Sequence, residues 1–414
     1  MKTLIQTEWR LLLFGLLMTF WSSPGQTFFI SLFSGAIRED LALSHAQFGG
    51  IYSLATLASA AVVIWSGALV DRIPLRRLSS AVIIALAAST FVLSLSNSAI
   101  LLLIALFLIR QFGQSLMMLI ASTTLVRYID SAKGKATALG GMGYHLAEAV
   151  MPSLVIFLLA LIGWRASLQA ASGFLLIAVL PLTWILLNKH RERHRQYLSE
   201  IAAFNKSNDS AVANNTEVKV KRQWTRKEVL RDKRFYLFMP AFLAHTIFFT
   251  GFIFHQIHLI ETKGWSLSVW GSLFVMSAVI AIISKLATGV VIDKIGSIRL
   301  VPFVAVPLAI GLLLLSSSSH IAAGAGFLFL MSITTGMQTT LSAPFWSDLY
   351  GSKNLGSIKS LSSALIAFAS ALAPFAMGWF IDQGTTIETI AIASAIYIFF
   401  ATLLALYAQK LCKD

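Results

Sequence analysis

Cysteine, acidic residues and charged residues in general are scarce in this chain of 414 residues. Its one cysteine, Cys412, stands near the C-terminus, which excludes an intrachain disulfide and a cysteine-based metal site. Only 12% of the residues are charged and 18 are acidic, too few to cover the surface of a soluble fold. Water is therefore not the main solvent of this protein.

Motifs for catalysis and nucleotide binding are also missing. The sequence has no cluster with metal-ligand spacing and no nucleophile beside a base. The segment GKAT at Gly134 lacks the preceding glycine and the strand of a phosphate-binding loop. We therefore expect neither an enzyme nor an ATP-driven machine, and we predict no catalytic residue, no metal and no cofactor.

Apolar residues make up 57% of the chain, and the mean hydropathy is +0.77. Runs of about 20 apolar residues have the length that crosses a hydrocarbon core. Twelve such runs occur, at approximately 11 to 33, 47 to 70, 79 to 97, 100 to 122, 136 to 161, 166 to 188, 236 to 258, 269 to 292, 299 to 317, 320 to 345, 358 to 380 and 387 to 409. Lipid cannot pair with an open backbone, and the alternation of a membrane barrel is missing, so the sequence predicts an all-α membrane protein with twelve transmembrane helices.

The 32 lysines and arginines are distributed unequally between the two sides of these spans. Three of them, Arg38, Arg165 and Lys263, fall on one side, and Arg110 and Lys285 lie inside spans. The other 27 share the side of both termini, which the positive-inside rule places in the cytoplasm of a multi-pass inner-membrane protein. The net charge of +14 thus indicates topology and contact with lipid headgroups, and we expect no nucleic-acid partner.

The chain divides into an N-terminal six-helix bundle at 1–188, a polar cytoplasmic linker at 189–235 and a C-terminal six-helix bundle at 236–414. The two bundles repeat one another at a constant offset of 222 residues. This offset pairs Gly67 with Gly289, Asp71 with Asp293, Gly134 with Gly356 and Pro152 with Pro374. Chance similarity between apolar segments is the alternative, but matches at Gly, Asp and Pro without a gap favour a duplicated unit.

A loop motif follows the second and the eighth span. It reads GALVDRIPLRR from Gly67 to Arg77 and GVVIDKIGSIR from Gly289 to Arg299. Both copies resemble the cytoplasmic-loop motif Gly-x-Leu-x-Asp-Arg-x-Gly-Arg-Arg of the major facilitator superfamily. A plain positive-inside turn is the alternative. The first copy departs from the family pattern at Pro74, where the second keeps Gly296, and RQFGQ from Arg110 to Gln114 is similar to the fourth-span motif with compressed spacing.

The resemblance implies secondary transport, in which two bundles tilt about a central site that faces each side of the membrane in turn. The glycines of the loop motif would allow close helix approach, and its carboxylates and cations would hold one state of the tilt. The gating residues predicted on this basis are Gly67, Asp71, Arg72, Arg76, Gly289, Asp293, Lys294 and Asp348, the last paired with Lys294 or Arg299.

Ionisable groups inside the spans are costly unless they face water, protein or substrate, and they are therefore functional candidates. Arg110 lies near mid-depth of the fourth span, and His145 and Glu148 share one face of the fifth. Lys285 lies in the eighth span, where transporters that resemble the monocarboxylate and oxalate groups often carry an arginine. At the offset of 222 residues, none of the four corresponds to an ionisable residue in the other half. The repeated architecture therefore does not require these charges, which favours a functional role over a structural one.

Alternatives remain for these charges. An Arg110–Glu148 ion pair would only lock the N-terminal half, whereas Glu148 or His145 could carry a coupling proton. Further candidates for a wet cavity are Gln26, which follows a polar break in the first span, and Gln114, His245 and Gln338 in later spans.

Three functions stay open. The first is proton-coupled transport of a small organic anion by a monomer, favoured by Arg110 and Lys285. The second is proton-driven efflux of drugs or amphiphiles, disfavoured because AEAVMPSLV in the fifth span lacks a Gly-Pro-rich antiporter motif. The third, from another class, is a membrane sensor without transport, for which the linker is too polar to fold as an added domain.

Overall fold

The computed structural model describes residues 2–67, 69–129, 133–188, 192, 224–351 and 355–412. These residues form helices and no strand, which confirms the predicted all-α fold class. Most of the predicted linker, 189–191 and 193–223, lies outside the described residues, and the predicted bundle boundaries remain predictions.

The helices of the N-terminal half are α1 (Lys2–Trp21), α2 (Thr27–Ile30), α3 (Ser34–Asp40), α4 (His45–Ser66), α5 (Leu69–Arg72), α6 (Leu75–Ser94), α7 (Ala99–Ile109), α8 (Met118–Tyr128), α9 (Lys133–Phe174) and α10 (Leu180–Leu186). Those of the C-terminal half are α12 (Arg226–Val229), α13 (Lys233–Phe254), α14 (Gln256–Lys263), α15 (Leu267–Ile295), α16 (Ser297–Leu300), α17 (Val306–Ser317), α18 (Ile321–Tyr350), α19 (Leu355–Asp382) and α20 (Ile387–Lys410). Between them lie the short 3-10 segments η1 (Ser23–Gly25), η2 (Ser31–Phe33) and η6 (Val301–Phe303) and the π-helical segments η3 (Arg110–Met117) and η5 (Leu175–Val179).

Ten helices among the described residues are long and apolar enough to cross a membrane. One of them, Ala136–Leu186, has 51 residues and contains two predicted spans, joined at Gly163. The φ of Gly163 is 73°, a backbone conformation that glycine adopts without steric cost. The first predicted span, which is not among the ten, runs from the second half of α1 through η1 and α2 to η2. The described helices are therefore consistent with twelve spans.

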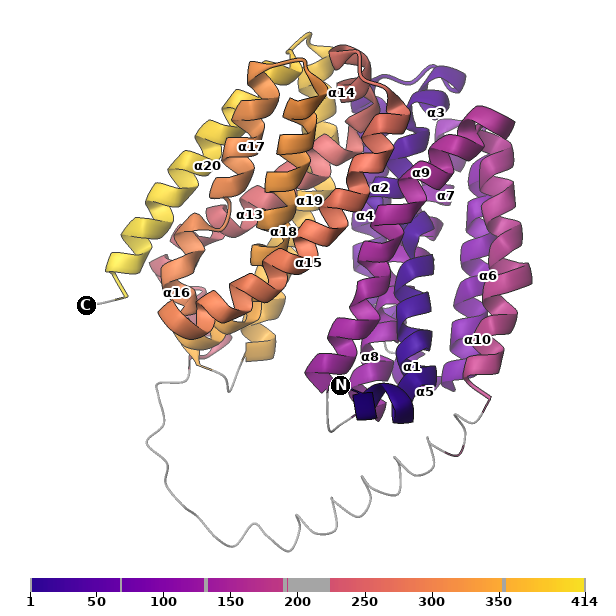
Figure 1. Ribbon diagram of the computed structural model, residues 1–414, viewed down its shortest axis with the longest axis horizontal. Helices are drawn as coiled ribbons and strands as arrows, with labels where there is room; N and C mark the ends of the chain where they lie inside the picture. Colours follow the sequence, from indigo (N-terminus) through magenta and orange to yellow (C-terminus); the bar gives the residue numbers. More distant parts are fainter. Residues whose placement is uncertain are drawn as a thin grey trace, which may run out of the picture.

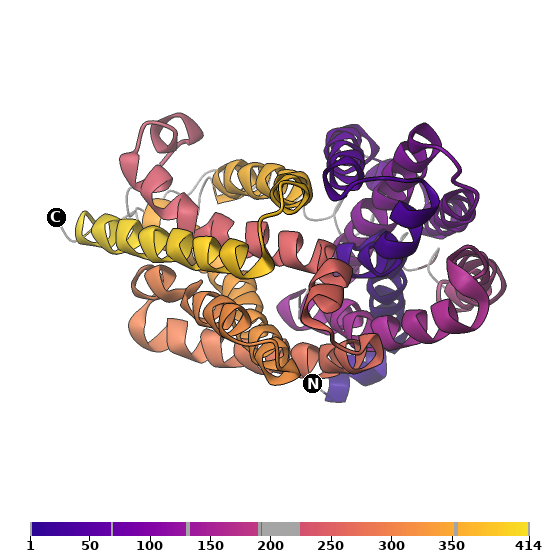
Figure 2. The same ribbon diagram turned by 90° about the horizontal axis from the view of Figure 1, so that it is seen from above.

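Helices α1–α10 form one bundle and α13–α20 form a second bundle beside it (Figures 1 and 2). We call the end with the N-terminus, α5 and α16 the terminal end, and the opposite end, with α3 and α14, the distal end. The bundles lie close together at the distal end and diverge toward the terminal end (Figure 1). Two helix pairs, α4 with α19 and α9 with α15, make the main contacts between them.

The contact between α4 and α19 is a close approach of two backbones. A Cβ atom added to Gly49 would lie 2.6 Å from the carbonyl oxygen of Pro374, and one added to Gly378 would lie 2.6 Å from that of His45. Small residues permit such contacts between helices in a membrane. The two bundles therefore meet here along surfaces with few interlocking side chains.

Large apolar side chains cover the outside of both bundles. Ile177, Leu286 and Trp65 are 81%, 71% and 71% exposed, values that water would penalise in a soluble protein. A bilayer accepts such a surface, because its hydrocarbon tails are as apolar as the side chains. The exposed apolar surface agrees with the predicted membrane protein.

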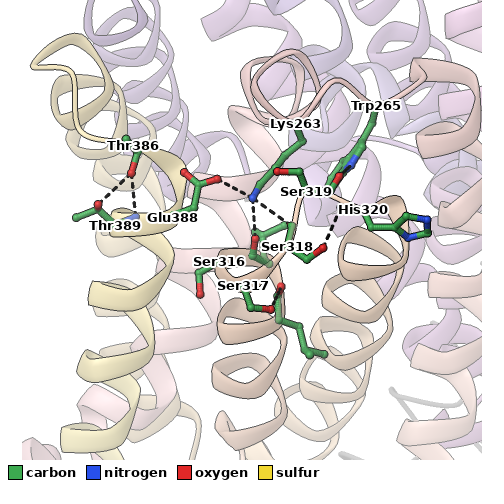
Figure 3. Close-up of polar contacts among 12 residues, drawn as sticks. Lys263, Trp265, Ser316, Ser317, Ser318, Ser319, His320, Thr386, Glu388 and Thr389 are labelled. Carbon is green, nitrogen blue, oxygen red and sulfur yellow. Dashed lines mark hydrogen bonds and ion pairs between the residues drawn. The ribbon is translucent and has the colours of Figure 1, made fainter.

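At the distal end, the C-terminal bundle buries a lysine. The Nζ atom of Lys263 lies 2.6 Å from a carboxylate oxygen of Glu388 and donates to the carbonyls of Leu315 and Ser318 at 2.9 and 3.2 Å (Figure 3). Nearby, the indole of Trp265 donates to the carbonyl of Ser319 at 2.6 Å. These contacts join α14 to the α17–α18 loop and to the start of α20, and they satisfy a buried cation.

Candidate functional site

The first span breaks near its middle, and the broken ends pack against the π-helix of the fourth span. A Cβ atom on Gly25 would lie 2.5 Å from the backbone nitrogen of Gln114, so no larger residue fits between the two segments. Arg110 donates to the carbonyl oxygen of Gly25 at 3.0 Å. Its guanidinium lies over the ring of Tyr52, 4.9 Å from the centroid, and only 2% of the residue is exposed.

Gln111, which the sequence analysis did not select, ties this junction to α4. Its side-chain oxygen accepts from Ser59 at 3.0 Å, and its amide nitrogen donates to Ser66 at 2.7 Å. The neighbouring glutamines are placed differently. Gln26 is buried and donates to Ser22 at 3.2 Å, whereas Gln114 is half-buried. The polar run RQFGQ was a usable signal for Gln111, but the π-helical turn that aims each side chain has no sequence signature.

A chain of three ionisable groups connects the two bundles near the middle of the spans. Lys285 on α15 lies with its Nζ atom 2.8 Å from Nε2 of His145 on α9. The Nδ1 atom of the same ring lies 3.4 Å from a carboxylate oxygen of Glu148. His145 and Glu148 are 5% and 7% exposed, and Tyr144 packs edge-on against the imidazole.

The geometry of this chain restricts the protons it can hold. If Lys285 is an ammonium, it donates to Nε2, and the imidazole must then carry its proton on Nδ1 and donate it to Glu148. A second proton on His145 would make both ring nitrogens donors. Lys285 and His145 would then lose their hydrogen bond and repel each other.

Polar atoms without a hydrogen-bond partner lie in the C-terminal bundle. Gln338 on α18 donates to the carbonyl of Phe242 at 2.9 Å, but its buried side-chain oxygen has no partner among the described residues. His245 on α13 lies 3.5 Å from the hydroxyl of Thr335, and its Nδ1 atom is likewise buried without a partner in the described part of the chain. Such atoms are costly unless a ligand or water meets them.

The structure brings together some predicted site residues and separates others. Lys285, His145 and Glu148 meet; the sequence had placed His145 and Glu148 on one helix face but had not predicted their contact with Lys285. The alternative ion pair of Arg110 with Glu148 is not formed: Arg110 binds Gly25 and Tyr52 within its own bundle, and Glu148 binds His145. The broken helix explains the difference, because the carbonyl freed at Gly25 is a nearer acceptor for Arg110 than a carboxylate of α9.

Some of the predicted gating residues make close contacts in the structure, and others do not. Gly67 allows a close approach, since a Cβ there would lie 3.2 Å from Leu119 of α8, but a Cβ on Gly289 would meet nothing within 4 Å. Arg76 lies over the ring of Trp184 at 4.4 Å. The side chains of Asp71, Arg72 and Asp293 lie outside the described part of the structure.

Asp348 accepts a short hydrogen bond from the hydroxyl of Ser297, at the start of α16, and its expected pairing with Lys294 or Arg299 stays a prediction. Lys294 is exposed at the end of α15. Gly296, which separates these helices, has a φ of 84°, which Pro74 in the first copy of the motif cannot adopt. The two copies of the loop are therefore built differently.

Comparison with known proteins identifies the family. The model of the Major Facilitator Superfamily matches residues 15–328 and 249–410, so the chain belongs to this superfamily of membrane transporters. A search of curated proteins found no match to the sequence. The fold is that of a secondary transporter, which is not an enzyme and works by alternating access on a small-molecule substrate.

Solved structures share the fold at low identity. A bacterial homologue of the human lysosomal transporter Spinster, inward-facing and unoccupied, has a TM-score of 0.66 at 14% identity over 97% of both chains. The nucleoside transporter NupG has a TM-score of 0.71 at 12% identity over 98% of both chains. Sequence identities this low support a shared fold and nothing more specific, and the resemblance to the monocarboxylate branch stays a prediction.

The junction of η1 and η3 generates a stability prediction. We expect Gly25→Ala to lower the midpoint of thermal unfolding in detergent, because the new methyl group would displace two backbones at a cost of about 1–3 kcal/mol. Gly141→Ala is the matched control, since a Cβ there meets nothing within 4 Å. Equal midpoints for both variants, measured by size-exclusion chromatography after heating, would contradict the tight junction.

Proposed function

We propose that this protein moves a small organic anion across the inner membrane by alternating access and couples the movement to protons. The observation that carries the proposal is the chain Lys285–His145–Glu148, which joins the two bundles. A cation and a proton-binding pair are in direct contact there, and the contact cannot survive protonation of His145. Intramembrane groups of this kind commonly serve substrate and proton pathways.

Coupling follows from competition for Lys285. In the unprotonated chain, the ammonium of Lys285 donates to His145, whose other ring nitrogen contacts the carboxylate of Glu148. When a proton enters, His145 releases Lys285, which becomes available for a substrate carboxylate. Proton and anion would thus bind together. Binding of either one alone would leave the site at the centre of the membrane with a net charge, because the charges of Lys285 and Glu148 already balance each other.

The remaining candidates have separate tasks in this proposal. Arg110 supports the break in the first span, next to which the buried Gln26 donates to Ser22. The unpartnered atoms of His245 and Gln338 would receive polar groups of the substrate from the C-terminal bundle. Efflux of drugs or amphiphiles gains no specific observation from the structure. We propose a monomer, because each chain holds one complete central chain of groups.

We also propose that the terminal end faces the cytoplasm, as the charge split of 27 to three indicates. In a Cys412→Ser background, Asn97→Cys should react with an impermeant thiol reagent added to intact cells. Lys359→Cys, at the terminal end of α19, should react only after the cells are opened. Labelling of Lys359→Cys in intact cells would reverse the orientation.

Removing the charge of Lys285 should weaken substrate binding. A buried charge-assisted contact contributes about 1.5–3 kcal/mol, so Lys285→Gln should raise the apparent KM roughly ten- to a hundredfold. The measurement is counterflow in proteoliposomes, with a labelled carboxylate found by an uptake screen. Lys359→Gln, which removes an exposed lysine, is the control and should leave KM unchanged. A normal KM with a lower yield of folded Lys285→Gln would assign Lys285 a structural role instead.

Removing the proton-binding groups should have a different effect. Glu148→Gln keeps the size and the hydrogen bonding of the side chain but cannot exchange a proton. This variant should lose accumulation driven by a pH gradient yet retain counterflow, since exchange of substrate needs no net proton movement. His145→Ala should behave likewise. Proton-driven accumulation by both variants, with the pH dependence of the wild type, would refute proton coupling at this site.

A further inference from the structure

A carboxylate of one bundle caps a helix of the other at the distal end. Asp382, the last residue of α19, accepts from the hydroxyl of Ser44 at 2.7 Å and from the backbone nitrogens of His45 and Ala46 at 3.1 and 2.7 Å. These nitrogens belong to the first turn of α4, where helices have unpaired N–H groups and a partial positive charge. The contact therefore favours an ionised Asp382.

Helix α4 does not need this carboxylate in order to form. Ser44 and Gln47 already make a complete capping box: the Ser44 hydroxyl accepts from the nitrogen of Gln47 at 3.2 Å, and the Gln47 side chain accepts from the nitrogen of Ser44 at 2.9 Å. Asp382 accepts hydrogen bonds from the N–H groups of His45 and Ala46, which the capping box does not use. Its contribution is thus to the contact between bundles rather than to the helix itself.

A second polar contact closes the same end in a buried position. Gln256 of α14 donates to the hydroxyl of Ser31 at 2.7 Å and to the carbonyl of Phe28 at 3.4 Å, and it accepts from Trp270 at 2.8 Å. Both acceptors belong to the N-terminal bundle. None of these groups changes charge with pH, whereas Asp382 in the first contact can.

Three histidines lie beside the capped turn. The ring centroid of His45 lies 4.6 Å from that of His258 and 5.5 Å from that of His255. His255 is buried and its Nε2 atom lies 2.9 Å from the carbonyl of Pro374, which fixes this nitrogen as a donor. His45 and His258 are partly exposed and can exchange protons with the distal side.

The charges around His45 oppose its protonation. Burial disfavours a positive charge on His45 most strongly, followed by Arg38 and His258, and Asp382 offsets these effects only in part. Burial and then Arg38 also disfavour a charge on His258, which Asp382 partly offsets, while Glu261 and Asp382 lie near enough to Arg38 to offset its charge. The positive end of α4 adds to the repulsion, since His45 lies in its first turn. A proton on either histidine therefore weakens the closed contact.

The equivalent contact in the other half has none of these groups. At the offset of 222 residues, Asp382 corresponds to Ala160, His45 to Leu267, His255 to Phe33 and His258 to Ala36. The pair α9–α15, which is related to α4–α19 by the repeat, thus joins the bundles without a carboxylate cap or histidines at these positions. The architecture of the fold does not require the cluster, which indicates a separate task.

We propose that Asp382, His45 and His258 form a proton-responsive latch that keeps the distal end closed and releases it when protons bind from that side. The contacts explain why protonation should open the distal end rather than close it. Protonation of Asp382 removes the charge that holds the first turn of α4, and protonation of the histidines adds cations beside Arg38. Both events favour separation of the bundles at the distal end. The latch uses no residue of the central chain, so it stands or falls independently of the transported substrate.

Distances between spin labels test the latch without any substrate. In a Cys412→Ser background, cysteines replacing Asn97 and Ser319 carry one label on an exposed distal loop of each bundle. In reconstituted wild type, the population of long distances should rise when the pH falls from about 7.5 to about 4, because burial and the neighbouring Arg38 oppose a charge on His45 and His258 until the solution is strongly acidic. Asp382→Asn should show roughly tenfold more of this population at the higher pH, as expected for loss of one charge at a helix end.

Three further variants complete the test. Asp40→Asn removes an exposed distal carboxylate whose partner Arg165 lies in the same bundle, so it should behave as wild type. The double variant His45→Gln/His258→Gln should stay closed at both pH values. Asp382→Ala, which cannot accept the three hydrogen bonds, should open at least as far as Asp382→Asn. The proposal is overturned if Asp382→Asn and Asp382→Ala match the wild-type distances, or if the histidine variant opens in acid like the wild type.

Discussion

A polar group inside a bilayer must find its partner within the protein, and this constraint explains the central features of the structure. The broken first span frees the carbonyl of Gly25, and the buried Arg110 binds it. The π-helical turn that follows Arg110 places Gln111 between two serines of α4. Lys285 has no such partner in its own bundle among the contacts described, and it reaches across to His145. The contact that joins the two halves thus results from the same requirement that stabilises each half.

Much of the fold could be predicted because the sequence features that indicate it each extend over many residues. Long apolar runs, the positive-inside imbalance and the constant repeat offset each sum over many residues, so local irregularities do not alter the result. The irregularities themselves were not predictable. At Gly163 a non-helical φ and ψ separate two successive spans, and π-helical segments begin at Arg110 and Leu175 within otherwise regular apolar runs.

The candidate site was predicted only as a set of residues. The sequence identifies Arg110, His145, Glu148 and Lys285 as candidates, because each is an ionisable group in an apolar run and placing such a group in a bilayer costs free energy. Which of them meet depends on the rotation of each helix about its axis, and the π-helical turn shifts that rotation for the part of the fourth span that follows Arg110. Asp382 escaped notice for the opposite reason. It stands at the exposed end of a span, where a carboxylate costs little and attracts no attention in a sequence.

The glycine contacts between α4 and α19 also bear on how fast the protein changes state. Where side chains interlock, one helix can move past another only after many rotamers have changed, which raises the activation barrier. Gly49 and Gly378 instead bring backbone against backbone, so α19 can roll over α4 with little repacking. The kinetic barrier would then lie mainly in the hydrogen bonds that join the bundles, those of Asp382 and Gln256 at the distal end and that of Lys285 with His145 near the middle. The turnover rate of the transporter would consequently depend on how quickly these few polar contacts break rather than on repacking of the interior.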